Sequence, residues 1–89
     1  MVKNKEEVYG LIYAINLLRA TPNRTSREEK VYLEACEDAR KLFDTVEDAD
    51  VAMALRLHYV NGMTWRDVAA CVGVPTIHAK CKKILKQGV

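Results

Sequence analysis

The chain has 89 residues, of which 49% are apolar and 29% are charged. This balance is typical of a soluble globular protein and excludes a disordered chain. The length fits one domain and excludes two. A domain this short buries a modest core, so dimerisation would be an easy way for it to bury more surface.

The net charge of +2 is unevenly distributed along the sequence. Residues 1–27 carry +3, residues 28–50 carry −6, residues 51–63 carry +1 and residues 64–89 carry +4. A basic final quarter beside an acidic middle indicates that one face of the protein meets a polyanion while another repels it. The alternative is a solvated, lysine-rich helix without a ligand.

The cysteines Cys36, Cys71 and Cys81 are odd in number, and no Cys-x-x-Cys pair occurs. This usage is typical of a reducing cytosol, so we expect a cytoplasmic protein. We expect neither a signal peptide nor a membrane span, because the apolar stretch 8–18 is too short. Cys71, His78 and Cys81 are not spaced like zinc ligands and lack a fourth partner, so we expect no metal and no cofactor.

Two amphipathic helices are predicted in the first half of the chain. Residues 5–19 repeat apolar side chains at spacings of three and four, and residues 21–23 (Thr-Pro-Asn) then break the helix. The second helix begins at Ser26, where residues 26–29 (Ser-Arg-Glu-Glu) form the pattern of a capping box. The expected core-facing side chains are Val8, Leu11, Ile12, Ile15 and Leu18, followed by Val31, Ala35, Ala39 and Leu42. With a short connection, the two helices should pair antiparallel.

Three more helices are predicted in the second half. The third covers about residues 51–60. The fourth opens at residues 64–67 (Thr-Trp-Arg-Asp), a capping box with aspartate in place of glutamate. Gly73 ends the fourth helix, and Pro75 suits the first turn of a fifth helix that runs to about Gln87.

These elements predict an all-α, five-helix single domain. No strand pattern or internal repeat competes with this interpretation. We expect a helical hairpin over residues 1–47, packed on a trihelical unit over residues 48–89.

The fourth and fifth helices fit a helix-turn-helix. Ala69 or Ala70 is small enough for the crossing of the two helices, and Gly73 can take the positive φ that the turn requires. One face of the fifth helix is apolar, with Ile77, Cys81, Ile84 and Leu85. Its other face carries Thr76, Ala79, Lys82, Lys83 and Lys86. Such a helix can enter the major groove with its first residues at base edges.

Residues 55–69 (LRLHYVNGMTWRDVA) resemble region 4 of bacterial sigma factors and the small sigma-like regulators of phages and prophages. In those families an LRYxxG stretch leads into an (S/T)(W/Y)xEIA helix, a glycine turn and a recognition helix. The resemblance covers about residues 48–87 and implies a transcription regulator. The family has about five residues between the turn glycine and the buried branched residue, whereas three separate Gly73 from Ile77. Either the turn is shortened, or Ala79 takes the buried position.

We therefore expect sequence-selective binding of duplex DNA, with lysines on phosphates and the start of the fifth helix on base edges. The expected contacts are Arg66, Thr76, His78, Ala79, Lys80, Lys82, Lys83 and Lys86. His58 and Trp65 are expected to pack in the core. The alternative is a protein-binding module that binds RNA polymerase or inhibits a host protein, for which the acidic stretch 28–50 could serve. We expect no enzyme, because the sequence offers no nucleophile–base pair and no phosphate-binding loop.

A homodimer is also expected. Apolar side chains beside the core-facing stripes of the first two helices are Tyr9, Tyr13, Leu17, Tyr32 and Phe43. Broad apolar faces often mark a partner surface. A symmetric dimer would place two recognition helices about one turn of DNA apart. The alternative is a monomer in which these side chains close a compact bundle.

Overall fold

The computed structural model describes residues 5–87, which contain five α-helices and no strand, so the all-α class is confirmed. The helices are α1 (Lys5–Ala20), α2 (Ser26–Phe43), α3 (Ala49–Leu55), α4 (Trp65–Val72) and α5 (Ile77–Gln87). Helix α3 continues directly into one turn of π-helix, η1 (Arg56–Val60). None of the helices between residues 5 and 87 combines the length and the apolar character needed to cross a bilayer.

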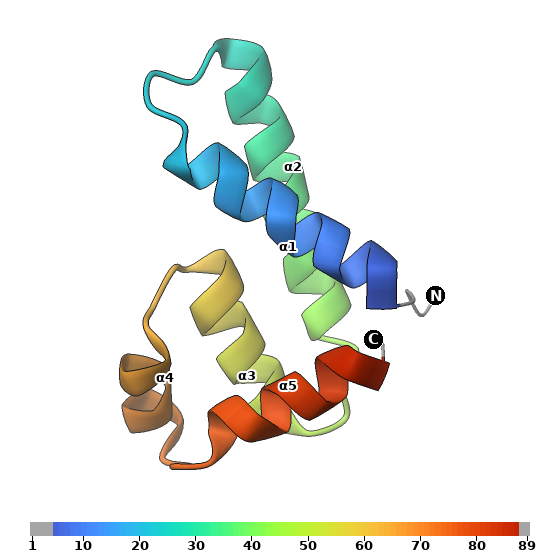
Figure 1. The fold of residues 1–89 in the computed structure, drawn as a ribbon, viewed down its shortest axis with the longest axis vertical. Coiled ribbons are helices and arrows are strands. Elements are labelled where there is room, and N and C mark those ends of the chain that lie inside the picture. Colours follow the sequence, from blue (N-terminus) through green and yellow to red (C-terminus); the bar gives the residue numbers. More distant parts are fainter. Residues whose placement is uncertain (1–4, 88–89) are drawn as a thin grey trace.

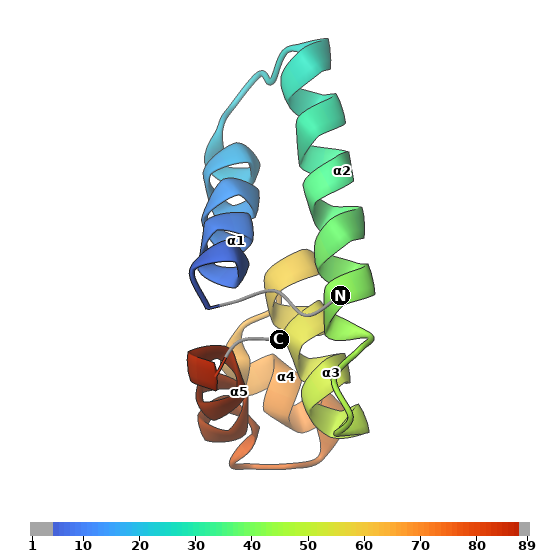
Figure 2. The same ribbon diagram turned by 90° about the vertical axis from the view of Figure 1, so that its right-hand side faces the viewer.

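The helices form a flat molecule of 38 × 29 × 16 Å. Figure 1 shows α1 and α2 as an antiparallel pair at one end of the long axis, with α3, α4 and α5 at the other end. In Figure 2, α1 lies above α5 on one side of the molecule, and α2 lies above α3 on the other side. Because a helix with its side chains is about 10–12 Å across, a molecule this thin leaves one face of most helices open to solvent.

The N-terminus of α2 differs by one residue from the prediction. Its N-cap is Thr25, whose hydroxyl accepts a hydrogen bond from the Glu28 backbone N–H at 3.1 Å, while the Glu28 carboxylate accepts one from the Thr25 N–H at 3.0 Å. The predicted box of Ser26 and Glu29 is therefore wrong. Arg24 binds the Glu29 carboxylate at 2.6 Å and holds it away from the helix end. Both Thr and Ser can cap a helix, and this ion pair favours the earlier residue.

The π-helical turn η1 was not predicted and is stabilised by the end of α1. The Asn61 N–H donates to the Arg56 carbonyl, five residues back, at 3.1 Å. The Arg19 guanidinium donates to the Tyr59 and Val60 carbonyls at 3.0 and 2.6 Å. A helix end leaves carbonyls without partners, and Arg19 satisfies two of them. Arg19 thus ties α1 to the segment that leads into α4.

The buried core draws on all five helices. Its fully or nearly fully buried members include Val8, Ile12, Ile15, Ala39, Phe43, Val51, Leu55, Val68, Ile77, Cys81 and Leu85. Phe43, expected beside the stripe, has no exposed surface, so that expectation is wrong. Val31, expected in the stripe, is 46% exposed. Helix α2 extends past the end of the short α3–α5 group, so α1 alone packs against its first turns, whereas its last turn lies over α3 and η1.

Candidate nucleic-acid interface

The connection between α4 and α5 is a short turn. Gly73 has φ +78° and ψ 19°, and its N–H donates to the Ala69 carbonyl at 2.8 Å. The Ile77 N–H then donates to the Val74 carbonyl at 3.1 Å, so α5 begins at Ile77 and not at Pro75 as predicted. Ile77 is fully buried and Ala79 is exposed. Ala79 therefore does not take the buried position, which Ile77 occupies.

Gly73 is expected to be the residue of this turn least tolerant of a side chain. Gly73→Ala places a Cβ on a left-handed backbone and should lower the free energy of unfolding by about 1 kcal/mol. The matched control is Gly10→Ala within α1, where φ is not positive and a Cβ would meet no described atom within 4 Å. Alanine there should stabilise the helix by roughly 0.5–1 kcal/mol. Urea unfolding of dilute protein compares the two, and equal effects would contradict the turn geometry.

A basic, exposed face lies along α5. The buried residues Ile77, Cys81 and Leu85 occupy one side of the helix. At 100° per residue, the opposite side carries Ala79, Lys82, Lys83 and Lys86, which are all exposed. No acidic residue occurs between Ile77 and Gln87. The structure therefore brings four of the eight expected contact residues onto one exposed helix face.

The other expected contacts lie at the margins of this face. Thr76 is exposed in the turn that precedes α5, and Arg66 is exposed in the first turn of α4. Lys80 lies on the flank of α5 that faces α3, in a shallow depression shared with Asp48, the N-cap residue of α3. Lys83 lines the same depression, so the Asp48 carboxylate lowers the local positive potential around both lysines.

His78 differs from the other expected contacts because it is part of a stack of three rings. The Trp65 ring lies between the two imidazoles, with centroids 3.9 Å from His58 at 18° and 4.3 Å from His78 at 14°. Tyr59 meets Trp65 edge-on at 5.9 Å. The stack joins η1, α4 and α5, and it sets the first turn of α4 against the first turn of α5. His78 is half-buried and one face of its ring is covered by Trp65, so only part of it is open to a ligand.

Sequence reasoning placed His58, Trp65 and His78 singly and missed their stacking. They are separated by seven and thirteen positions on three different elements, and no helical periodicity links such positions. Only the short turn at Gly73 and the path of η1 bring them together. The sole sequence signal was the concentration of four flat rings, those of His58, Tyr59, Trp65 and His78, in a 21-residue stretch, which has no single structural meaning.

Burial lowers the pKa of His58 below its ordinary value, and the charges of His78 and Arg19 lower it further, while a hydrogen bond to the Met63 carbonyl opposes this change. The His58 Nδ1 lies 2.7 Å from that carbonyl oxygen. Since a carbonyl only accepts, Nδ1 carries a hydrogen. Because its pKa is lowered, His58 is neutral in the folded protein at neutral pH, with its hydrogen on Nδ1.

The pH dependence of stability should follow from His58. The unfolded chain titrates near the ordinary histidine pKa of about 6.5 and takes up its proton at a higher pH than the folded chain does. Stability should be complete above about pH 7 and fall as the pH drops through 6.5 toward the lower pKa of the folded state. Urea unfolding at pH 7.5 and 5.5 measures the loss, and His58→Phe, which keeps an aromatic ring, should reduce it. An unchanged loss in His58→Phe would assign the acid sensitivity to other groups.

The three cysteines do not form a site. Cys81 is fully buried on the inner side of α5, and burial raises the pKa of its thiol to about 11, so the thiol stays neutral. Cys71 is exposed on α4 and Cys36 is half-buried on α2. Within residues 5–87, no three His, Cys, Asp or Glu side chains are placed to hold a metal ion.

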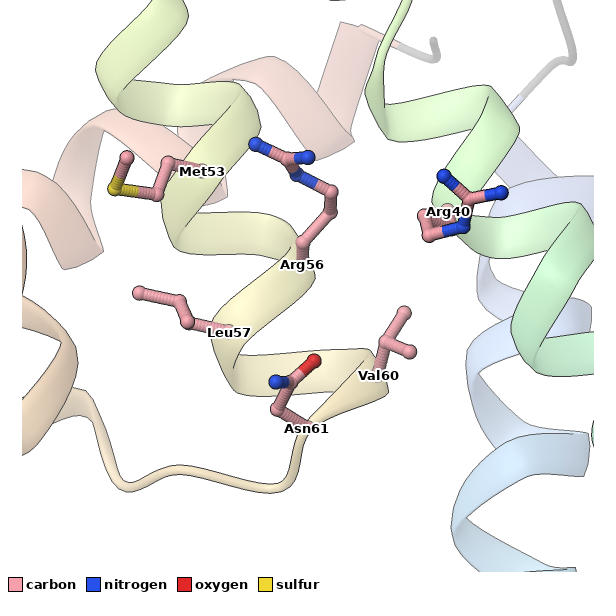
Figure 3. Close-up of a pocket in the computed structure, with 6 residues that line it drawn as sticks. All are labelled: Arg40, Met53, Arg56, Leu57, Val60 and Asn61. Carbon is pink, nitrogen blue, oxygen red and sulfur yellow. The ribbon is translucent and has the colours of Figure 1, made fainter.

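A pocket of about 330 Å³ lies between α2 and the α3–η1 segment (Figure 3). Its lining residues are Arg40, Met53, Arg56, Leu57, Val60 and Asn61. Both guanidinium groups are engaged within the chain, Arg40 with Glu37 at 3.1 Å and Arg56 with Asp44 at 3.2 Å. The Arg56 Nε is buried without a hydrogen-bond partner among the described residues. The local charges cancel, and the lining contains no acid, base or nucleophile apart from the paired arginines.

The chain matches no protein-family model, no curated protein and no solved structure, so its function has to be inferred from the geometry of its own residues.

Proposed function

We propose that the chain binds duplex DNA sequence-selectively and acts as a transcription regulator, with α4 and α5 as its helix-turn-helix. The observation that carries this proposal is the outward face of α5, which combines exposed lysines with the absence of any acidic residue between Ile77 and Gln87. A merely solvated helix tends to mix both signs of charge, as α2 does with its acidic and basic residues.

The dimensions of α5 suit the major groove. Its 11 residues make a rod about 16 Å long and 10–12 Å across, and the groove is about 12 Å wide. Thr76 and Ala79 lie at the leading end, where recognition helices meet base edges. Lys82, Lys83 and Lys86 are placed for phosphates, which supply most of the affinity.

The remaining parts of the chain are proposed to support this helix. The unit of α3, α4 and α5 presents the basic face, and the α1–α2 hairpin packs on this unit. The resemblance of residues 55–69 to region 4 of sigma factors favours the same assignment. Within the acidic stretch 28–50, α2 lies on the far side of the molecule from α5 in Figure 2 and mixes both signs of charge, whereas Asp48 lies beside Lys80 and Lys83. The outward face of α5 is therefore the part of the surface that is expected to attract a polyanion.

The direct test is fluorescence anisotropy with a labelled duplex of random sequence, titrated at several salt concentrations. The proposal expects binding whose log affinity falls linearly with log salt, with a slope of about −0.9 for each neutralised phosphate. Enrichment of duplexes from a random pool would then give the preferred site. Absence of binding at about 50 mM salt, where electrostatic affinity is strong, would overturn the proposal.

A second candidate is a protein-binding module that contacts RNA polymerase. The observation in its favour is the run of exposed acidic residues that follows α2, namely Asp44, Glu47, Asp48 and Asp50, together with the shortened turn, which changes the approach of α5 to the groove. Purified bacterial RNA polymerase holoenzyme and core enzyme are the probes. Retention of the chain by core enzyme, with no affinity for duplex DNA, would favour this candidate over the first.

A further inference from the structure

The outer side of α1 is an apolar face that nothing in residues 5–87 covers. Tyr9, Tyr13 and Leu17 are 44%, 68% and 53% exposed. They recur every four residues, so they form one stripe along the helix. The neighbouring positions on the same side of the helix, Gly10, Asn16 and Ala20, are also exposed and uncharged. From Tyr9 onward this face, called here the α1 outer face, carries no charged side chain.

Neither the backbone conformation nor any contact within residues 5–87 requires a glycine at position 10. Glycine inside a helix destabilises that helix relative to alanine. Its φ is not positive, and a Cβ at this position would meet no described atom within 4 Å. The remaining physical use of a glycine is close approach by another backbone. Gly10 lies beside the stripe, where a second helix would cross.

The stripe is symmetric about its middle residue. Tyr13 stands four residues from both Tyr9 and Leu17. A two-fold axis beside Tyr13 therefore places Tyr13 against Tyr13 of the second copy, and Tyr9 against Leu17 of the second copy. An uncharged face can meet its own copy without like-charge repulsion. We propose that two copies of this chain associate through the α1 outer face, with the two α1 helices antiparallel. This inference does not rest on DNA binding.

The area is in the range of a weak, specific dimer. The three stripe side chains expose on the order of 300 Å² in each chain, as judged from the surface of an aromatic side chain. With the backbone and small residues between them, a symmetric pair buries roughly 1,000 Å² in total, close to the lower limit for specific interfaces. We expect an interface of this size to associate weakly, so the dimer should appear at micromolar concentrations.

The exposed apolar residues of α2 do not offer the same opportunity. Leu33 is 57% exposed, about as much as Leu17, but its helix neighbours include Glu29, Lys30 and Glu37. With two glutamates and one lysine around Leu33, two copies that met there would bring charged side chains, mostly of the same sign, close together. Leu33 therefore serves as the matched control for the stripe.

Sedimentation equilibrium over a concentration series from about 1 to 200 µM tests the association. Wild-type protein should pass from 10.1 kDa toward twice that mass. Tyr13→Glu, which places two carboxylates on the axis, should remain at the monomer mass, and Leu33→Glu should behave as wild type. Circular dichroism should show both variants folded, because both side chains are exposed. A wild-type mass of 10.1 kDa throughout, or equal loss in both variants, would overturn the proposal.

Disulfide trapping tests the direction of pairing. Cys36 and Cys71 are first replaced by serine, and Tyr13→Cys and Tyr9→Cys are then oxidised separately. In the antiparallel pair Tyr13→Cys should cross-link to its own copy, whereas the two copies of Tyr9→Cys stand about 12 Å apart along the helices and should not. Cross-linking of Tyr9→Cys as fast as Tyr13→Cys would indicate parallel helices and would overturn the proposed arrangement.

Discussion

Replacing Lys80, Lys82, Lys83 and Lys86 with glutamine should lower the affinity for duplex DNA by roughly three orders of magnitude at about 0.1 M salt. Each lysine that leaves a phosphate removes the release of about one counterion, so the slope of log affinity against log salt should become shallower by up to about four units. The four side chains are exposed, and their loss should leave the fold intact. Fluorescence anisotropy over a salt series measures both quantities.

The control for this variant is matched in charge. Lys82→Gln with Lys83→Gln removes two positive charges from α5, and Lys30→Gln with Lys41→Gln removes two from exposed positions of α2. If α5 contacts phosphates, the first pair should reduce the salt slope by about two units and the second should have a small effect. Equal effects from the two pairs would show that net charge, and not a particular helix, governs the affinity.

Trp65→Ala should have the largest effect of the single substitutions on stability, about 2–4 kcal/mol, because it removes the middle ring of a three-ring stack. For a domain of this size the midpoint of thermal unfolding should fall by roughly 10–20 °C. The loss arises at the point where η1, α4 and α5 meet. DNA affinity should therefore decline even at temperatures where Trp65→Ala remains folded, since α5 loses its lateral support.

Trp65→Phe tests whether the stacking of a flat ring or the volume of the Trp65 side chain contributes more to stability. Phenylalanine keeps a flat ring between His58 and His78, and its cost should stay below about 1.5 kcal/mol. Thermal unfolding followed by circular dichroism compares the two variants. If Trp65→Phe were as damaging as Trp65→Ala, the contribution of Trp65 would lie in the volume it fills and not in the stacking.

The parts of the fold that depend on neighbours in sequence were predictable. Gly73 was expected at positive φ and has φ +78°. Thr64 caps α4 by accepting a hydrogen bond from the Asp67 N–H at 3.2 Å. The spacing of Ile77, Cys81 and Leu85 gave the buried side of α5, and therefore also its exposed basic side. Caps, turns and helix faces are set by a few adjacent residues, which is why the sequence reveals them.

The parts that depend on distant residues were not predictable. Arg19 lies forty positions from Tyr59, and only the folded chain shows that its guanidinium caps η1. The burial of Phe43 depends on the position of α2 over α3 and η1, because helical periodicity alone places it at the edge of a stripe. Ser26 and Thr25 both fit a cap, and the Arg24–Glu29 ion pair, which decides between them, is a feature of the loop conformation. The candidate site follows the same rule. The exposed lysines of α5 follow from helical periodicity, whereas the stacking of His58, Trp65 and His78 depends on residues that are distant in sequence.

The hydrogen bonds of Arg19 have a consequence for how the two halves of the chain unfold. Without residues 1–47, the carbonyls of Tyr59 and Val60 would lose their donor, and the space filled by Phe43 would open. The two halves of the chain are therefore expected to form one cooperative unit and not two foldons. Amide hydrogen exchange in α1 and in α5 should report a common opening free energy, and the whole chain should unfold in one cooperative step.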